Sequence, residues 1–248
     1  MLRLQTIKSE EDMSSRTFWQ NALTGAVLTL CAVGAQAGPV MTLNHQIGGA
    51  RTDVAWSGGT YNDTGGGGFS GTLTNAGIHS HNPFLTYCVE LGEHFSLGVA
   101  YNNYSIMNAA SYLGTNPEAI ARNTRLANLF TWAVGNSSTW FSDKYKSSGM
   151  QLAVWEIIYD TDLSLTTGSF YAKSNTDANA RGYANTLLSH AGTTQANALS
   201  IWFLKAAGNQ DQLFWEDANG NQSTVPEPMS LALTAVALAG LALTRRRG

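Results

Sequence analysis

The strongest constraint on the fold is a change of hydrophobic period along the chain. From residue 41 to residue 91, short runs rich in strand-forming residues are separated by clusters of small and polar residues. The runs predicted as strands are Thr52–Gly58, Gly68–Thr74 and Phe84–Leu91. The predicted turns are Gly58-Gly59, Asn62-Asp63 and Gly65–Gly68. This part of the chain therefore predicts an antiparallel sheet.

The middle of the chain instead has a helical period. Three helices are predicted, Pro117–Trp132, Met150–Asp160 and Ala178–Ala191, and the second is expected to follow Gly149 with Ser147 and Ser148 as caps. Two aromatic-rich runs around Gly208-Asn209 then predict a final hairpin. We expect an α+β fold: an antiparallel β framework, sandwich or barrel-like, with an inserted middle of about three helices.

Composition excludes one class of function. Charged residues make up 12% of the 248-residue chain and the net charge is −3, so the sequence lacks the basic footprint of a nucleic-acid-binding protein. Abundant glycine and small polar residues, with 10% aromatics, are typical of strand-rich extracellular proteins. The sequence indicates no cofactor.

The N-terminal segment has the layout of a secretory signal peptide. Arg16 precedes an apolar run over residues 22–33, and residues 35–37 supply the small side chains of a cleavage site. The apolar run is shorter than the roughly 20 residues of a membrane span. We therefore expect residues 1–37 to be removed on export, with Met13 a candidate for the true start.

The C-terminal segment, residues 225–248, combines a proline-rich triplet, an apolar run over residues 229–244 and a basic end. The triplet is Pro226, Glu227 and Pro228, and the basic residues are Arg245, Arg246 and Arg247. This order resembles the PEP-CTERM sorting tail of exported Gram-negative bacterial proteins. The resemblance implies a transient inner-membrane helix, cleavage by an exosortase-type transpeptidase, and delivery to the cell surface or an extracellular matrix such as a biofilm. Residues 217–224 are expected to be a polar linker between this tail and a single domain over residues 38–216.

Only two cysteines occur, and Cys31 lies in the expected signal peptide, so Cys88 would be an unpaired thiol in an oxidising compartment. A buried, inert cysteine is one interpretation. A metal site with His79, His81 and His94 is another, although their spacing matches no strong metal motif. A Cys-His hydrolase is a third, because the sequence contains its ingredients.

Two short motifs favour a different chemistry. The aromatic-Cys-apolar sequence of Tyr87 and Cys88, and MQLAVW, which contains Gln151 and Trp155, resemble the Cys-Gln thioester domains of bacterial surface adhesins. Met150 departs from that pattern, since threonine often precedes the glutamine. The resemblance implies an internal thioester between Cys88 and Gln151 that an amine on a partner protein or polysaccharide opens, which leaves the partner covalently attached without enzymatic turnover.

The surroundings of the glutamine suit this interpretation. Trp155 lies four residues after Gln151, on the same helix face, where its indole can shield the bond, and Tyr87 is expected as a second shield. Gly149 permits close approach of another backbone. A cross-link closing this loop could also be purely structural. The rival prediction is a non-covalent matrix component that binds carbohydrate through the aromatic residues Trp56, Tyr61, Trp140 and Trp215.

Overall fold

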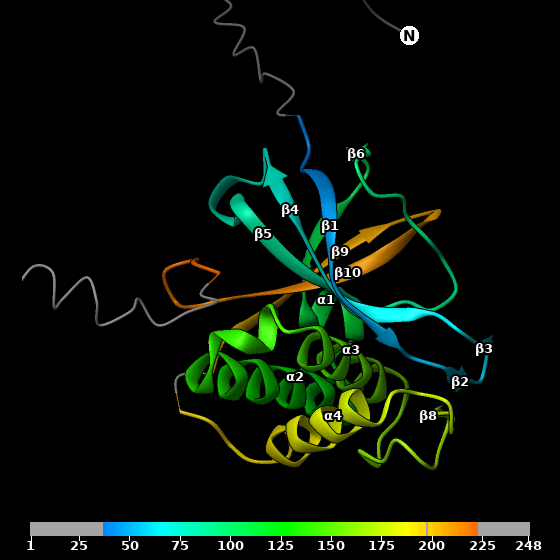
Figure 1. Ribbon diagram of the computed structural model, residues 1–248. Coiled ribbons are helices and arrows are strands. Elements are labelled where there is room, and N and C mark those ends of the chain that lie inside the picture. The colour runs from blue at the N-terminus through cyan, green and yellow to red at the C-terminus, as the bar shows by residue number, and fades with distance from the viewer. Residues whose placement is uncertain (1–36, 197, 223–248) are drawn as a thin grey trace, which may run out of the picture. The chain divides into compact units, whose positions relative to one another are not determined.

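A computed structural model describes residues 37–196 and 198–222 (Figure 1). Its main element is a seven-stranded antiparallel sheet with the order β6-β1-β4-β5-β10-β9-β7. The strands are β1 (Val40–Arg51), β4 (Gly65–Thr74), β5 (His81–Cys88), β6 (Ala100–Tyr101), β7 (Ser105–Asn108), β9 (Ser200–Ala206) and β10 (Asn209–Glu216). A smaller sheet has the order β3-β2-β8, from β2 (Val54–Trp56), β3 (Gly59–Tyr61) and β8 (Phe170–Ala172).

The helices follow the first strands and precede the last hairpin. They are α1 (Ala109–Leu113), α2 (Pro117–Asn136), α3 (Lys144–Tyr159) and α4 (Ala178–Ala191), with short 3-10 turns at Gly77–His79 and Ser138–Phe141. In Figure 1 the three long helices lie together beside the curled sheet. The predicted α+β class, with about three helices inserted into an antiparallel framework, is confirmed.

Both faces of the sheet are buried because it curls into a half-barrel. One face packs with the helices in a large core that includes Leu213 and Trp215 of β10. The alternate residue Phe214 points to a second core, formed by Met41, Leu43, Leu73, Phe84, Tyr104, Leu204 and Ala206. Since strands that are not neighbours, β1 and β9, contribute to this second core, the sheet must bend around it.

Two sequence predictions of local structure are wrong. Helix α3 begins at Lys144, not after Gly149, and its cap is Asp143, whose carboxylate accepts from the N–H groups of Tyr145 and Lys146. Ser147 and Ser148 lie inside the helix, where both are buried. Residues Gly65–Gly68, expected as a turn, are the first residues of β4. They pair with the end of β1.

The remaining elements are close to expectation. Helix α2 begins at Pro117 and α4 has the predicted bounds. The final hairpin forms as β9 and β10. The predicted strand Phe84–Leu91 is shifted toward the N-terminus and ends at Cys88, which places the cysteine at the end of its strand.

Candidate functional site: a buried cysteine and three glutamines

Cys88 lies near the middle of the large sheet, opposite Gln212 of β10. Its side chain is buried, and it is the one free cysteine in the described part of the chain. Tyr87 precedes it and points to the other face, where its ring packs with Phe130 and Trp215. The Tyr87 hydroxyl lies 3.3 Å from the Ser147 hydroxyl. The two neighbouring residues therefore face different surroundings.

The side chain of Gln151 reaches the backbone of Cys88 from helix α3. The Cys88 N–H donates to Gln151 Oε1 at 3.1 Å, and Gln151 Nε2 donates to the Cys88 carbonyl oxygen at 2.7 Å. Gln151 is only 1% exposed. The predicted partners, 63 positions apart in the sequence, are thus brought together, with both ends of the carboxamide fixed by one residue's backbone.

Contacts along α3 explain why Gln151 reaches this point. The Ser147 hydroxyl donates to the Ile47 carbonyl oxygen at 2.7 Å and accepts from the Gly68 N–H at 3.0 Å. The Ser148 hydroxyl donates to Gly66 O at 2.6 Å and accepts from the Ala50 N–H at 3.1 Å. One turn of α3 is therefore hydrogen-bonded directly to the backbones of β1 and β4.

The other side of the same turn is pressed against α4. A Cβ atom on Gly149 would lie 2.8 Å from the Ala180 carbonyl oxygen and 2.8 Å from Tyr183 Cβ. The close backbone approach that the sequence predicted at Gly149 is confirmed, and the approaching element is α4.

Two further glutamines contact the thiol. The Cys88 S–H group donates to Gln210 Oε1 at 2.9 Å, and Gln212 Nε2 donates to Cys88 Sγ at 3.3 Å. Burial raises the pKa of the Cys88 thiol to about 12, and the hydrogen bond from Gln212 partly offsets this. The resting thiol is therefore protonated at neutral pH and surrounded by neutral amides.

Cys88 and Gln151 line a cavity of about 150 Å³. Its wall also includes Gly65, Gly66 and Gly67 of β4, together with Tyr61, Thr64, Phe69, His94, Trp155 and Gln210. Trp155 is 7% exposed, and its buried indole N–H has no hydrogen-bond acceptor within the described residues. Of the two residues expected to shield the bond, Trp155 borders the cavity, whereas Tyr87 lies in the core beneath the helices.

The three histidines do not lie together: His94 lines the same cavity as Cys88, whereas His79 and His81 contact Glu216. His79 Nδ1 and His81 Nε2 lie 2.8 Å and 2.7 Å from the two carboxylate oxygens of Glu216. His94 borders the cavity near the Tyr61 ring. Over the residues that the structure describes, no hydrogen bond joins Cys88 to a histidine, and Cys88 belongs to no cluster of potential metal ligands.

The four aromatic residues considered for sugar binding lie in different environments. Trp140 and Trp215 are buried, and Trp215 stacks with both Phe130 and Phe141. Trp56 and Tyr61 are half-buried, with ring centroids 5.0 Å apart. Only this second pair presents ring surface toward solvent.

Comparisons with protein-family models, curated proteins and solved structures find no significant match to this chain. The expected signal peptide and the sorting-tail residues lie outside the described residues. This holds for Pro226, Glu227, Pro228, the apolar run 229–244, Arg245, Arg246 and Arg247. Within residues 37–196 and 198–222, no helix has the length and apolar character needed to span a membrane.

Sequence reasoning missed Gln210 and Gln212. Both lie on β10, where every residue from Gln210 to Glu216 is buried. Alternation of polar and apolar residues normally places the polar ones toward water. Residues 209–212 instead form a continuous polar run, which predicts exposure, so the sequence carried no local signal that these two glutamines are buried.

Proposed function

We propose that Cys88 and Gln151 form an internal thioester and that the protein uses it to attach covalently to amine-bearing partners at the cell surface or in an extracellular matrix. The observation that carries the proposal is the two-point hydrogen bonding of the Gln151 carboxamide to the backbone of Cys88. It presents the carboxamide carbon beside the residue that supplies the nucleophile, as proximity catalysis requires.

The chemistry of bond formation balances without a cofactor. Cys88 Sγ attacks the Gln151 Cδ atom, the Cδ–Nε2 bond breaks, and the thiol proton leaves with the nitrogen as ammonia. The Cys88 N–H already donates to Gln151 Oε1, the oxygen on which negative charge develops in the tetrahedral intermediate. In the resting protein the thiol proton is hydrogen-bonded to Gln210 Oε1, and it must move from there to the departing nitrogen.

Attachment would reverse the roles of the same atoms. A primary amine attacks the Gln151 Cδ atom, the Cδ–Sγ bond breaks, and Cys88 leaves with a proton. Gln212 Nε2 supports this step because it donates to Sγ, the atom that carries charge as the leaving group. Each bond reacts once, so the activity is not that of an enzyme.

Intact mass measurement of the purified protein tests the bond. We expect the wild-type protein to be lighter than its sequence by one ammonia. Cys88→Ala and Gln151→Ala should each show their full calculated mass. Gln210→Ala is the matched control, because Gln210 borders the same cavity and contacts the same thiol but is not the proposed acyl donor.

The outcomes separate clearly. A full-mass wild-type protein with a titratable thiol contradicts the thioester. Loss of ammonia that persists in Gln151→Ala but disappears in Gln210→Ala would show that Gln210, not Gln151, is the acyl donor. Incubation with methylamine then tests reactivity: an adduct on Gln151 with release of one thiol supports attachment, whereas an inert bond indicates a structural cross-link.

Export and sorting remain a separate proposal, which rests on the sequence of residues 1–37 and 225–248. Replacement of Pro226, Glu227 and Pro228 by alanine should leave the uncleaved protein in the inner-membrane fraction if an exosortase processes this tail. Unchanged appearance of the variant at the surface or in the matrix would contradict the assignment.

A further inference from the structure

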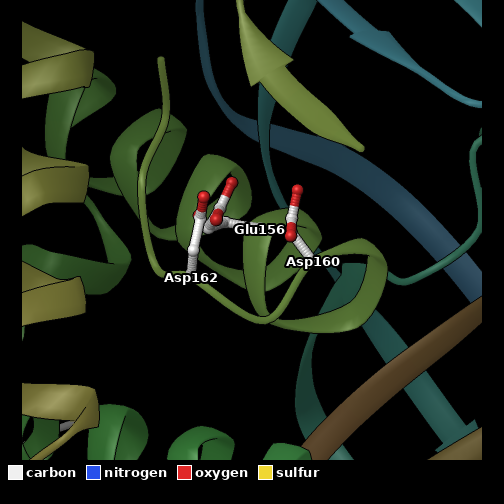
Figure 2. A group of neighbouring side chains, drawn as sticks. All are labelled: Glu156, Asp160 and Asp162. Carbon is white, nitrogen blue, oxygen red and sulfur yellow. The ribbon is translucent and has the colours of Figure 1, made fainter. Parts of the chain in front are cut away.

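A cluster of three carboxylates lies at the C-terminal end of α3, after Gln151 in the sequence. Glu156 belongs to the helix, Asp160 is its C-cap residue, and Asp162 follows in the loop that leads to β8. Figure 2 shows Glu156 and Asp162 next to each other, with Asp160 beside them and the carboxylates directed to the same side. One oxygen or more from each lies within 4.8 Å of the others.

The three carboxylates lack a positively charged partner among the described residues. In the described part of the chain, none of the three forms an ion pair with a lysine, arginine or histidine. Glu156 is fully buried. Buried charges are normally paired or bound to a metal.

An unsatisfied atom points to a missing ligand independently of this clustering. Glu156 Oε1 accepts from the Ser164 N–H at 2.9 Å, but the buried Oε2 has no hydrogen-bond partner within the described residues. Leaving a buried acceptor unpaired is costly, and the cost is greatest for a charged group. A cation in contact with Oε2 removes both the unpaired acceptor and the repulsion between the carboxylates.

We propose that Glu156, Asp160 and Asp162 bind a Ca²⁺ ion. Calcium takes oxygen ligands at about 2.3–2.6 Å, so two ligands on opposite sides of one ion lie up to about 5 Å apart. The spacing of the three carboxylates fits within that span. A shell of six to eight ligands leaves room for water or carbonyl oxygens, and flexible loop ligands suit calcium better than the rigid octahedron of magnesium.

The ion would fasten the loop over residues 160–169 to the last turn of α3. That loop already contacts the helix through Asp160, whose Oδ2 accepts from the Ser169 and Phe170 N–H groups. Phe170 in turn packs near Trp155, which borders the cavity at Cys88. The proposal does not depend on the thioester, because within the described residues the hydrogen bonds of Cys88 and Gln151 involve none of these three carboxylates.

Thermal unfolding of the full-length protein at pH 7.4 provides the test, with CaCl₂, MgCl₂ or EDTA as the only variable. Extracellular calcium sites bind with a Kd of roughly 0.1–1 mM, so 10 mM CaCl₂ should raise Tm by about 3–10 °C over EDTA. Magnesium should have a smaller effect. Terbium should give sensitised emission, because Trp155 adjoins Glu156 in the sequence.

Two charge-removing variants separate ion binding from a structural role. In the wild-type protein the Ser164 N–H donates to both Glu156 and Asp162. The side-chain amide oxygen introduced by either substitution can still accept this hydrogen bond. Glu156→Gln and Asp162→Asn should therefore fold, match or exceed the wild-type Tm in EDTA, and lose the calcium shift. Glu118→Gln, on the exposed start of α2, is the control and should keep it, as should Cys88→Ala.

Three results would overturn the assignment. The first is a wild-type Tm that is equal in CaCl₂ and EDTA, together with no terbium emission. The second is an undiminished calcium shift in both Glu156→Gln and Asp162→Asn, which would place the ion elsewhere. The third is an equal response to magnesium.

Discussion

Replacement of Gly149 by alanine tests how tightly the helix that carries Gln151 is packed. The added Cβ would lie 2.8 Å from the Ala180 carbonyl oxygen, 2.8 Å from Tyr183 Cβ and 3.0 Å from the Ala184 nitrogen. All three are backbone atoms or are fixed directly to the backbone of α4. No side chain can rotate away, so α3 and α4 would have to move apart.

The expected magnitude follows from two opposing effects. Glycine in a helix interior is less favourable than alanine by about 1 kcal/mol, so the substitution gains this amount from helix propensity. Overpacking a buried site typically costs about 1–3 kcal/mol. Because three atoms resist the same methyl group, we expect the upper part of that range and a net loss of about 1–2 kcal/mol. For a domain of this size Tm should fall by about 2–8 °C.

Gly182→Ala supplies the matched control for the Gly149 substitution. Gly182 lies inside α4, it is exposed, and a Cβ atom added there would meet nothing within 4 Å. Only the propensity effect applies there, so Gly182→Ala should be more stable by about 1 kcal/mol. Paired thermal or urea unfolding measures both. If Gly149→Ala is as stable as Gly182→Ala, the close contact between α3 and α4 is wrong.

The thiol and the indole at the cavity give two further predictions. In Gln151→Ala the thiolate fraction at pH 8 should be small because the pKa of Cys88 is about 12, so alkylation should be at least about a thousandfold slower in the native protein than in urea. The native rate should keep rising above pH 9, and equal rates in both states would contradict the burial of the thiol. Trp155→Phe should speed hydrolysis of the proposed thioester, which mass spectrometry detects as the gain of one water. The control is Trp202→Phe, which removes a buried indole N–H that does not border the cavity and should leave the hydrolysis rate unchanged.

Helices with one apolar face were the elements best predicted from the sequence. The bounds of α4 were found because its buried residues recur at helical spacing and its ends are marked, and α2 was found for the same reason. Helix α3 is different, since every residue from Ser147 to Ile157 is buried. A helix surrounded on all sides has no periodic stripe, so its true start at Lys144 carried no signal except the cap at Asp143.

The predictions made from serine and glycine residues were wrong for a related physical reason. A serine before an apolar run suits a helix cap, but the Ser147 and Ser148 hydroxyls instead bond to strand backbones. Gly65–Gly68 suit a turn, yet they form part of β4, because atoms of the neighbouring chain segments lie too close for side chains there. The pairing of Cys88 with Gln151 came from family resemblance, and no local rule would have found Gln210, Gln212 or the unpaired oxygen of Glu156.

The size of the cavity bears on which kind of partner can reach Cys88. A cavity of about 150 Å³ holds a benzene-sized group of about six non-hydrogen atoms. An extended lysine side chain has about this number of atoms beyond its backbone, whereas a hexose has about twice as many. A sugar ring would therefore have to bind outside, near Trp56 and Tyr61, while a slender primary amine can enter far enough to meet Gln151. The same geometry that would bury the proposed bond from bulk water thus favours an amine at the end of a flexible chain as its nucleophile.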